Sequence, residues 1–200
     1  MKNLKDLGDG NFLIKNVRLS YLFCFEPQTN VDPKTGKVTK KHKATGILPN
    51  DTHAEEIKYL RDYMTKLQKD VFKARLPADK LCLRDGDQSG KDEYENAWIF
   101  VCSEKEENPP ACLDRDGKTK VKKSDDKLYS GAIGNLRVRL WTQNNDWGKR
   151  INANFLGVQF IEHGDKFSAV DRPKEDEMFD SEGEVETNDD WADEAGDGLD

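Results

Sequence analysis

No apolar run in this sequence approaches the roughly 20 residues that a membrane-spanning helix needs. The first residues, MKNLKDLGDG, also lack the apolar stretch of a signal peptide, so we expect a cytosolic protein. Histidine is scarce: His42, His53 and His163 stand apart, and none lies near a serine or cysteine in a recognisable catalytic setting. These absences disfavour a membrane protein and a hydrolase built on a Ser–His or Cys–His pair.

Paired cysteines are missing as well. Cys24, Cys82, Cys102 and Cys112 stand singly in apolar stretches, without C-x-x-C spacing. A zinc site needs cysteines or histidines paired at short spacing. We therefore expect no metal and no cofactor, and we interpret the cysteines as buried free thiols in a reducing compartment.

The charges that are present divide the chain into two parts. Residues 171–200 contain fourteen acids against Arg172 and Lys174, a net charge of −12. The whole chain is at −7, so residues 1–170 carry +5. The acidic segment has too few apolar residues to offset its chain entropy, which predicts a folded domain over 1–170 and a disordered tail over 171–200. Parts of opposite sign are expected to attract each other.

Alternation of apolar residues predicts a mainly β domain. In 11–26, the odd positions from Val17 to Phe25 predict one apolar face, and PKTG at 33–36 predicts a turn. The expected strands cover 11–26, 37–48, 80–84, 96–103, 110–114, 129–143 and 150–162. About seven short strands with one inserted helix favour a β-barrel.

The inserted helix is expected over 52–75. Thr52 and Glu55 have the spacing of a capping box, and Pro77 prevents further extension. Its apolar residues recur at intervals of three and four and form one stripe, which we expect to pack on the sheet: Ile57, Leu60, Met64, Leu67 and Val71.

The stretch NLRVRLWTQ, residues 135–143, has the features of a binding surface. Successive side chains of a strand face opposite ways, so Leu136, Val138 and Leu140 suit a core. Arg137, Arg139, Trp141 and Gln143 then form the outer face. Arginine binds phosphate and stacks on planar rings, and tryptophan stacks on any base. This strand predicts a groove for single-stranded nucleic acid.

Other residues could extend that surface. Trp98 and Phe100 share one face of NAWIFVC, where packing in the core remains the alternative. The loop NNDWGKR and the basic stretches at 34–43 and 118–123 add charge and one aromatic ring. The full candidate set is Arg137, Arg139, Trp141, Tyr129, Trp98, Phe100, Trp147, Lys149, Arg150, Lys40, Lys41 and Lys43.

The segment LYSGAIGNLRVRLWTQNN, followed by NANFLGVQFIEHGDKF, resembles the C-terminal half of a family of bacteriophage single-stranded-DNA-binding proteins. NAWIFVC and PPACLDRDG occur upstream in the family's usual order, and the resemblance covers roughly 10–170. It implies an OB-fold that coats single strands in phage replication and recombination. A phage origin would place the protein in the host cytoplasm.

The resemblance also implies a disordered acidic tail that competes with DNA and contacts replication proteins such as a polymerase, helicase or primase. Better-known tails end in an aromatic residue, whereas this chain ends Gly198-Leu199-Asp200. Trp191 and Leu199 are therefore the candidate apolar anchors. The acids expected around them are Asp189, Asp190, Asp193 and Glu194. A homodimer remains open.

Two other functions remain as alternatives. The turn DGDQSGKDE places Asp85, Asp87 and Ser89 like the start of a calcium loop, but Asn96 occupies the position of the bidentate glutamate. A metal-dependent nuclease would need these carboxylates, although no partner anchored on a strand can be identified. The other alternative is an interaction protein whose acidic tail mimics nucleic acid on a basic partner.

Overall fold

The computed structural model describes residues 1–33, 35–146 and 148–167. Within these ranges eight strands form one sheet. The strands are β1 (Leu4–Asp6), β2 (Asn11–Val31), β3 (Val38–Pro49), β4 (Leu83–Asp85), β5 (Ala97–Lys105), β6 (Ala111–Leu113), β7 (Ile133–Asn145) and β8 (Gly148–Glu162). The helical segments are α1 (Asn50–Leu67), the π-helical turn η1 (Gln68–Phe72) that continues it, and the 3-10 turns η2 (Ala78–Lys80), η3 (Asp87–Ser89), η4 (Asp92–Tyr94) and η5 (Lys123–Asp125).

Five of the strands close a barrel. β2 pairs with β3 and β7, β3 pairs with β5, and β7 pairs with β8, all antiparallel. A parallel contact between Ser103 of β5 and Asn154 of β8 completes the ring. A closed five-stranded barrel of this order has the topology of an OB-fold. The prediction of a mainly β barrel with one inserted helix is confirmed, and α1 follows the second barrel strand.

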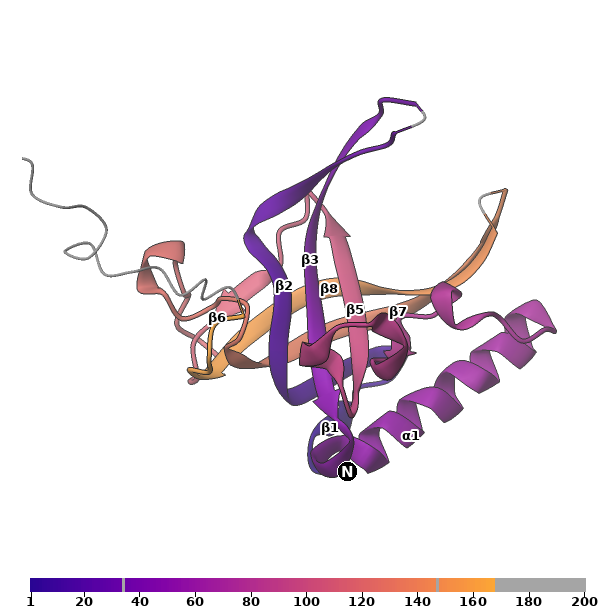
Figure 1. The fold of residues 1–200 in the computed structure, drawn as a ribbon, viewed down its shortest axis with the longest axis horizontal. Coiled ribbons are helices and arrows are strands. Elements are labelled where there is room, and N and C mark those ends of the chain that lie inside the picture. The colour runs from indigo at the N-terminus through magenta and orange to yellow at the C-terminus, as the bar shows by residue number, and fades with distance from the viewer. Residues whose placement is uncertain (34, 147, 168–200) are drawn as a thin grey trace, which may run out of the picture. The chain divides into compact units, whose positions relative to one another are not determined.

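Two hairpins project from the barrel (Figure 1). β2 and β3 stay paired out to Val31 and Val38, and the turn predicted near 33–36 closes with a 2.8 Å bond from the Gly36 N–H to the Asp32 carbonyl. β7 and β8 stay paired out to Asn145 and Gly148. In OB-folds, these two connections flank the face that binds oligonucleotides. No helix among the described residues is long and apolar enough to cross a membrane.

The inward face of β2 changes twice along the strand. Asn16 and Tyr21 have φ of 54° and 46°, and the pairing register shifts beside both residues. Such β-bulges exchange the two faces of a strand. Val17 and Leu19 are buried as predicted, but Tyr21 is 41% exposed and Cys24 is buried in its place. The prediction of one continuous apolar face was therefore wrong beyond Leu19.

The start of α1 differs from the prediction. The helix begins at Asn50, and Pro49 precedes it without a side-chain cap. The Thr52 hydroxyl hydrogen-bonds the Nδ1 atom of His53 at 2.9 Å instead of capping the helix. The predicted capping box was wrong because Thr52 lies inside the first helical turn.

The apolar stripe of α1 packs on the barrel as expected. Ile57, Leu60 and Met64 are buried in the main core. After Leu67 the chain continues into the π-helical turn η1, which widens the spacing by one residue. Val71 is consequently 43% exposed, and Phe72 is buried in its stead. The periodicity thus predicts the stripe up to Leu67 and fails where the helical pitch changes.

The four cysteines are free thiols. Cys24, Cys82 and Cys102 are buried and Cys112 is half-buried, which confirms the expectation for three of them. Burial raises the pKa of the Cys82 thiol to about 12. A thiol with so high a pKa is a poor nucleophile at neutral pH, so this cysteine serves packing.

Candidate nucleic-acid interface

A groove of about 440 Å³ lies where the β7–β8 hairpin meets the ends of β3 and β5. We call it the central groove. Its walls come from the four strands β3, β5, β7 and β8, and they carry cationic, amide and aromatic side chains. The lining residues are Lys41, Ser103, Glu104, Lys105, Trp141, Gln143, Arg150, Asn152, Ala153 and Asn154.

The pairing of β7 with β8 places the key side chains on one face. Trp141 lies opposite Asn152, and Gln143 lies opposite Arg150. Directly paired residues of antiparallel strands project to the same side. Leu140 is buried on the other side, whereas Trp141 is 42% exposed. The two faces predicted for this strand are therefore present, and its outer face forms part of the central groove.

Trp141 is an unusual surface residue. Nothing in the described part of the chain stacks on its ring or places a cation over it. Exposing a large aromatic ring forgoes the free energy that burial would provide. In a concave, basic surface, such a ring is available to stack on a planar ligand.

The charge of the central groove is positive. Lys41, Lys105 and Arg150 contribute three cations, and Glu104 is the one acid among the lining residues. The Glu104 carboxylate accepts a hydrogen bond from the Asn154 amide. Arg150 forms no ion pair within the described ranges. It does lie close enough to Asp79 to help lower the pKa of that carboxyl, after the larger effect of the hydrogen bond from Lys80.

The structure brings three predicted residues together in the central groove, namely Lys41, Trp141 and Arg150. Arg139 and Lys149 are exposed on the neighbouring parts of the hairpin, outside the groove walls. Lys40 instead pairs with Glu106 at 3.2 Å. The remaining basic candidate of the first hairpin, Lys43, lies over the ring of Tyr21 at 5.8 Å.

Arg137 occupies the same outer row but is half-buried. Its Nη1 atom is buried and is the one such side-chain atom in the described residues without a hydrogen-bond partner. A buried N–H group of a cation that has no hydrogen-bond acceptor costs free energy of folding. The Arg137 guanidinium can therefore form a further hydrogen bond that the described chain does not provide.

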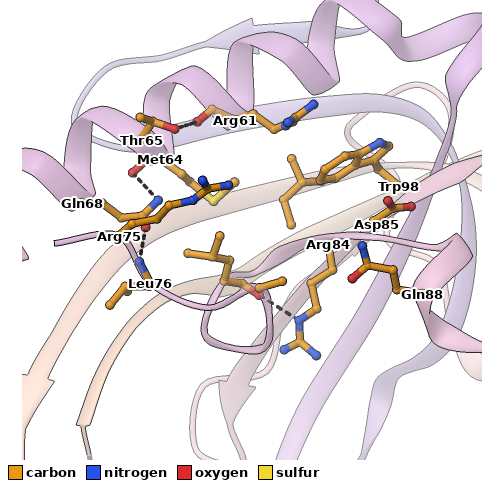
Figure 2. A pocket seen from close by; sticks show the side chains of 13 residues that line it. Arg61, Met64, Thr65, Gln68, Arg75, Leu76, Arg84, Asp85, Gln88 and Trp98 are labelled. Carbon is orange, nitrogen blue, oxygen red and sulfur yellow. Dashed lines mark hydrogen bonds between the residues drawn. The ribbon is translucent and has the colours of Figure 1, made fainter.

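Phe100 and Trp98 have separate environments. Phe100 is fully buried in the core, so its assignment as a DNA contact was wrong and the core alternative holds. Trp98 lies near the start of β5, half-buried, and lines a second pocket beneath α1 (Figure 2). The register of β5 is consistent with this difference, because Phe100 pairs with Gly46, whereas Trp98 pairs with Leu48, close to the point where β3 leads into α1.

Tyr129 is not part of the groove. β7 begins only at Ile133, and Trp141 lies roughly 26 Å further along the strand. The Tyr129 hydroxyl donates to the Gly164 carbonyl at 2.9 Å, and its ring stacks with His163. At Gly131, a Cβ would lie 2.1 Å from the Asp165 carbonyl oxygen. The YSG and GD motifs therefore join the start of β7 to the end of β8, and Tyr129 contributes to this junction rather than to the central groove.

Some predicted residues lie outside the described ranges. These are Trp147 of the second hairpin and the tail residues Asp189, Asp190, Trp191, Asp193, Glu194 and Leu199. The boundary predicted at residue 170 lies there too.

The acids of the DGDQSGKDE turn make hydrogen bonds to the backbone. Asp85 Oδ1 accepts from the Asp87 N–H at 3.2 Å, and Asp87 Oδ1 accepts from the Asn96 N–H at 2.7 Å. Among the residues described, no group of three or more His, Cys, Asp or Glu is placed to hold a metal ion. These carboxylates shape a turn.

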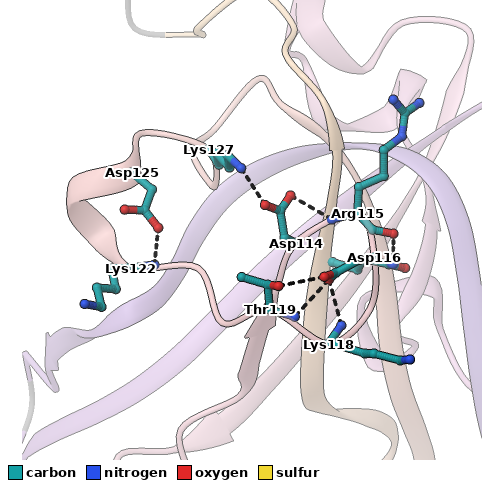
Figure 3. A network of polar contacts seen from close by, with 9 residues as sticks. Asp114, Arg115, Asp116, Lys118, Thr119, Lys122, Asp125 and Lys127 are labelled. Carbon is teal, nitrogen blue, oxygen red and sulfur yellow. Dashed lines mark hydrogen bonds and ion pairs between the residues drawn. The ribbon is translucent and has the colours of Figure 1, made fainter.

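The basic stretch 118–123 belongs to a segment of hydrogen-bonded turns, residues 114–127, which we call the lysine loop (Figure 3). Asp116 accepts from the backbone N–H groups of Lys118 and Thr119, both at 2.8 Å. The hydrogen bond from Lys127 lowers the pKa of the Asp114 carboxyl. Aspartates that cap turns and pair with lysines explain why this basic stretch is folded into ordered turns.

Sequence reasoning missed several groove residues. Ser103, Glu104 and Lys105 lie at the end of β5, and Asn152 and Asn154 lie on β8. Their positions follow from the registers Lys41↔Lys105 and Trp141↔Asn152, which no local pattern specifies. Given the barrel topology, period-2 alternation on β8 could have identified the two asparagines.

A barrel of this topology with a basic, aromatic groove beside its β2–β3 and β7–β8 connections is the arrangement of OB-fold proteins that bind nucleic acid. A model of the family described as Enterobacter phage Enc34, ssDNA-binding protein matches residues 11–191. The chain belongs to this family. It is also 30% identical over 164 residues to protein p50 of Acyrthosiphon pisum secondary endosymbiont phage 1, covering 78% of this chain and 85% of that protein.

Two solved structures of the bacteriophage Enc34 single-stranded DNA-binding protein share the fold. The complex with ssDNA is 26% identical, with a TM-score of 0.72 over 84% of this chain and 94% of that one. A C-terminal truncation is 28% identical, with a TM-score of 0.70 and the same coverage. These matches confirm the resemblance and the OB-like fold. The family and its solved members are binding proteins, in agreement with the prediction that the chain is not an enzyme.

Proposed function

We propose that the chain coats single-stranded DNA, largely without sequence preference, during phage replication and recombination. The observation that carries the proposal is Trp141, an exposed ring without a stacking partner among the described residues, in a groove with Arg150 and Lys41. A base stacks on the indole while the phosphates contact the cations. Binding unpaired bases shifts the duplex–single-strand equilibrium by mass action, without catalysis.

The amides of the central groove support a lack of sequence preference. Asn152 donates to Gln143 at 3.1 Å, and Gln143 donates to Asn145 at 3.1 Å. Asn154 donates to Glu104. Side chains that bond one another offer fewer free groups to the edges of bases, and stacking accepts every base.

The acidic tail is proposed to regulate this binding. A segment of −12 next to a domain of +5 can occupy a basic groove in place of phosphates. Displaced by DNA, the tail would be free to contact a polymerase, helicase or primase, with Trp191 and Leu199 as apolar anchors. The charge division supports this role.

The test compares the full chain with a chain ending at Val170, by fluorescence anisotropy with labelled oligo-dT at two salt concentrations. We expect both to bind, and the shorter chain to bind more tightly and with a steeper salt dependence. Equal affinities of the full and the shortened chain for oligo-dT would show that the tail does not regulate DNA binding. If neither binds at low salt, the coating function fails, and the alternative of a tail that mimics nucleic acid on a basic protein gains support.

A further inference from the structure

A second pocket, of about 460 Å³, lies between α1 and β4 (Figure 2). We call it the helix pocket. Arg61 of α1, Arg75 of the segment after η1, and Arg84 of β4 all line it, together with Trp98. The one acid among its lining residues is Asp85, which is engaged with the backbone of its own turn. Three successive segments of the chain thus bring guanidinium groups to a single concave surface beside an aromatic ring.

These arginines lack acidic partners. In the part of the chain that the structure describes, the cations of the ion pairs are lysines and the N-terminus, never an arginine. The Arg61 guanidinium lies over the Trp98 ring at 4.6 Å. Arg84 uses its Nε atom to donate to the Leu81 carbonyl at 2.9 Å, and Figure 2 shows the guanidinium turned away from Trp98. Like charges in one pocket repel unless an anion joins them.

The helix pocket and the central groove both share lining residues with a third cavity. A small cavity of about 80 Å³ lies between them, which we call the bridging pocket. It shares Leu81 and Arg84 with the helix pocket, and it shares Ser103, Arg150 and Asn152 with the central groove. A parallel bridge between Leu81 and Ile151 holds the two sides together. A line of arginines therefore leads from Arg150 past Arg84 to Arg75 and Arg61.

We propose that single-stranded DNA continues from the central groove through the bridging pocket into the helix pocket. This inference rests on the proposed function and extends the path of the strand. Arg84 and Arg75 contact phosphates there, and a base stacks on the paired surface of Arg61 and Trp98. Arginine suits both tasks, because its planar guanidinium binds phosphate oxygens in a fork and also stacks on rings.

The path predicts that affinity depends on oligonucleotide length. Short strands fill the central groove alone, and longer ones gain the contacts of the helix pocket. Site sizes of OB-folds range over about 4–16 nucleotides, so an oligo-dT series across and beyond this range separates the two pockets.

The experiment uses the full chain with Arg75→Gln and Arg84→Gln combined, titrated with the oligo-dT series at several salt concentrations. We expect the affinity for the shortest oligonucleotides to be unchanged and the affinity for the longest to fall by about five-fold or more. The slope of log affinity against log salt should become shallower by about 1.4, because each lost phosphate contact removes about 0.7. Arg75→Gln alone, at an exposed side chain, is a milder variant if the double variant is unstable. Arg115→Gln, an exposed arginine of the lysine loop, is the matched control.

The possible outcomes separate the two proposals. Equal weakening at every length, or no weakening, overturns the extended path while wild-type binding still supports the central groove. Tighter binding by the variant would identify the acidic tail as occupant of the helix pocket and also overturns the inference. If the wild-type chain binds no oligonucleotide of any length, the proposed function itself fails.

Discussion

The central groove and the lysine loop carry the same net charge, +2 each, counted over the groove's lining residues and over 114–127. Their chemistry differs. In the lysine loop, Lys127 pairs with Asp114 and Lys123 pairs with Glu26, and no aromatic residue is present. In the central groove, Arg150 has no ion pair within the described ranges, and Trp141 is exposed. Net charge alone does not distinguish a binding surface from a folded basic loop.

The difference lies in the exposed ring and in some of the cations. Lys123 and Lys127 of the loop hold carboxylates, whereas Lys41 and Arg150 of the groove form no ion pair within the described ranges, and Lys105 forms one with Glu107 at 3.9 Å. A lysine that already holds a carboxylate must give up that partner to take a phosphate, so its net gain is small. A cation without an acidic partner has no ion pair to give up, so its net gain on binding a phosphate is larger. An exposed indole adds a stacking surface that accepts any base. The following predictions, from the largest expected effect to the smallest, test whether binding follows this difference.

Trp141→Ala is expected to have the largest effect. Loss of one stacked base should weaken oligo-dT binding by about 1–3 kcal/mol, roughly 5- to 150-fold. Trp141→Phe should restore much of the affinity, because a flat ring remains. Anisotropy titration of both variants measures the change, and an unchanged affinity for Trp141→Ala would remove this residue from the site.

Arg150→Gln and Arg115→Gln form a matched pair, one in the central groove and one in the lysine loop. Removing a phosphate contact should reduce the slope of log affinity against log salt by about 0.7 for Arg150→Gln only. Titrations at three or more salt concentrations give the slope. Equal slopes for the two variants would show that the groove has no advantage over the loop.

Glu104→Gln should strengthen binding slightly. The carboxylate is the one acid lining the central groove, and its neutral isostere removes repulsion of phosphates. For a half-buried charge at the surface we expect a gain of about 1 kcal/mol, roughly five-fold at low salt. Weaker binding by this variant would instead mean that Glu104 positions Asn154 for the ligand.

Asp116→Asn should affect stability and leave binding unchanged. The Thr119 hydroxyl, followed by two backbone N–H groups, lowers the pKa of Asp116 from its ordinary 3.8. A carboxyl with a lowered pKa stabilises the fold above its ordinary pKa and loses this contribution as the pH falls through the lowered value. The variant's Tm should therefore be below wild type at pH 7, with a gap that closes below about pH 4. A change in oligo-dT affinity would contradict this prediction and would show that the lysine loop takes part in DNA binding.

The sequence predicts part of this site because one strand is regular. Along β7, Leu136 and Leu140 are buried while Trp141 is exposed, and period-2 alternation alone indicates this arrangement. The same alternation does not predict the faces of β2. Asn16 and Tyr21 adopt positive φ values there, and neither is the glycine that usually marks such a position in a sequence. The alternation of apolar and polar residues predicts the two faces of a strand only where no β-bulge interrupts the strand.

Most of the features that the sequence did not predict depend on contacts between residues far apart in the chain. Tyr129 has the sequence context of a strand residue, but its position is set by a hydrogen bond to Gly164, which follows the C-terminal end of β8. The helix pocket unites Arg61, Arg75 and Arg84, which no motif connects. The resemblance to the phage family nonetheless predicted the fold correctly, because motifs such as YSG and GD hold the barrel together.

The most direct test of the central claim is an amide and indole NMR titration of the full ¹⁵N-labelled chain with oligo-dT. Our account predicts the largest shifts at the Trp141 indole and at the amides of Arg150 and Asn152, with those of Lys118 and Lys122 unchanged. Shifts concentrated in the lysine loop, with the Trp141 indole unmoved, would contradict it.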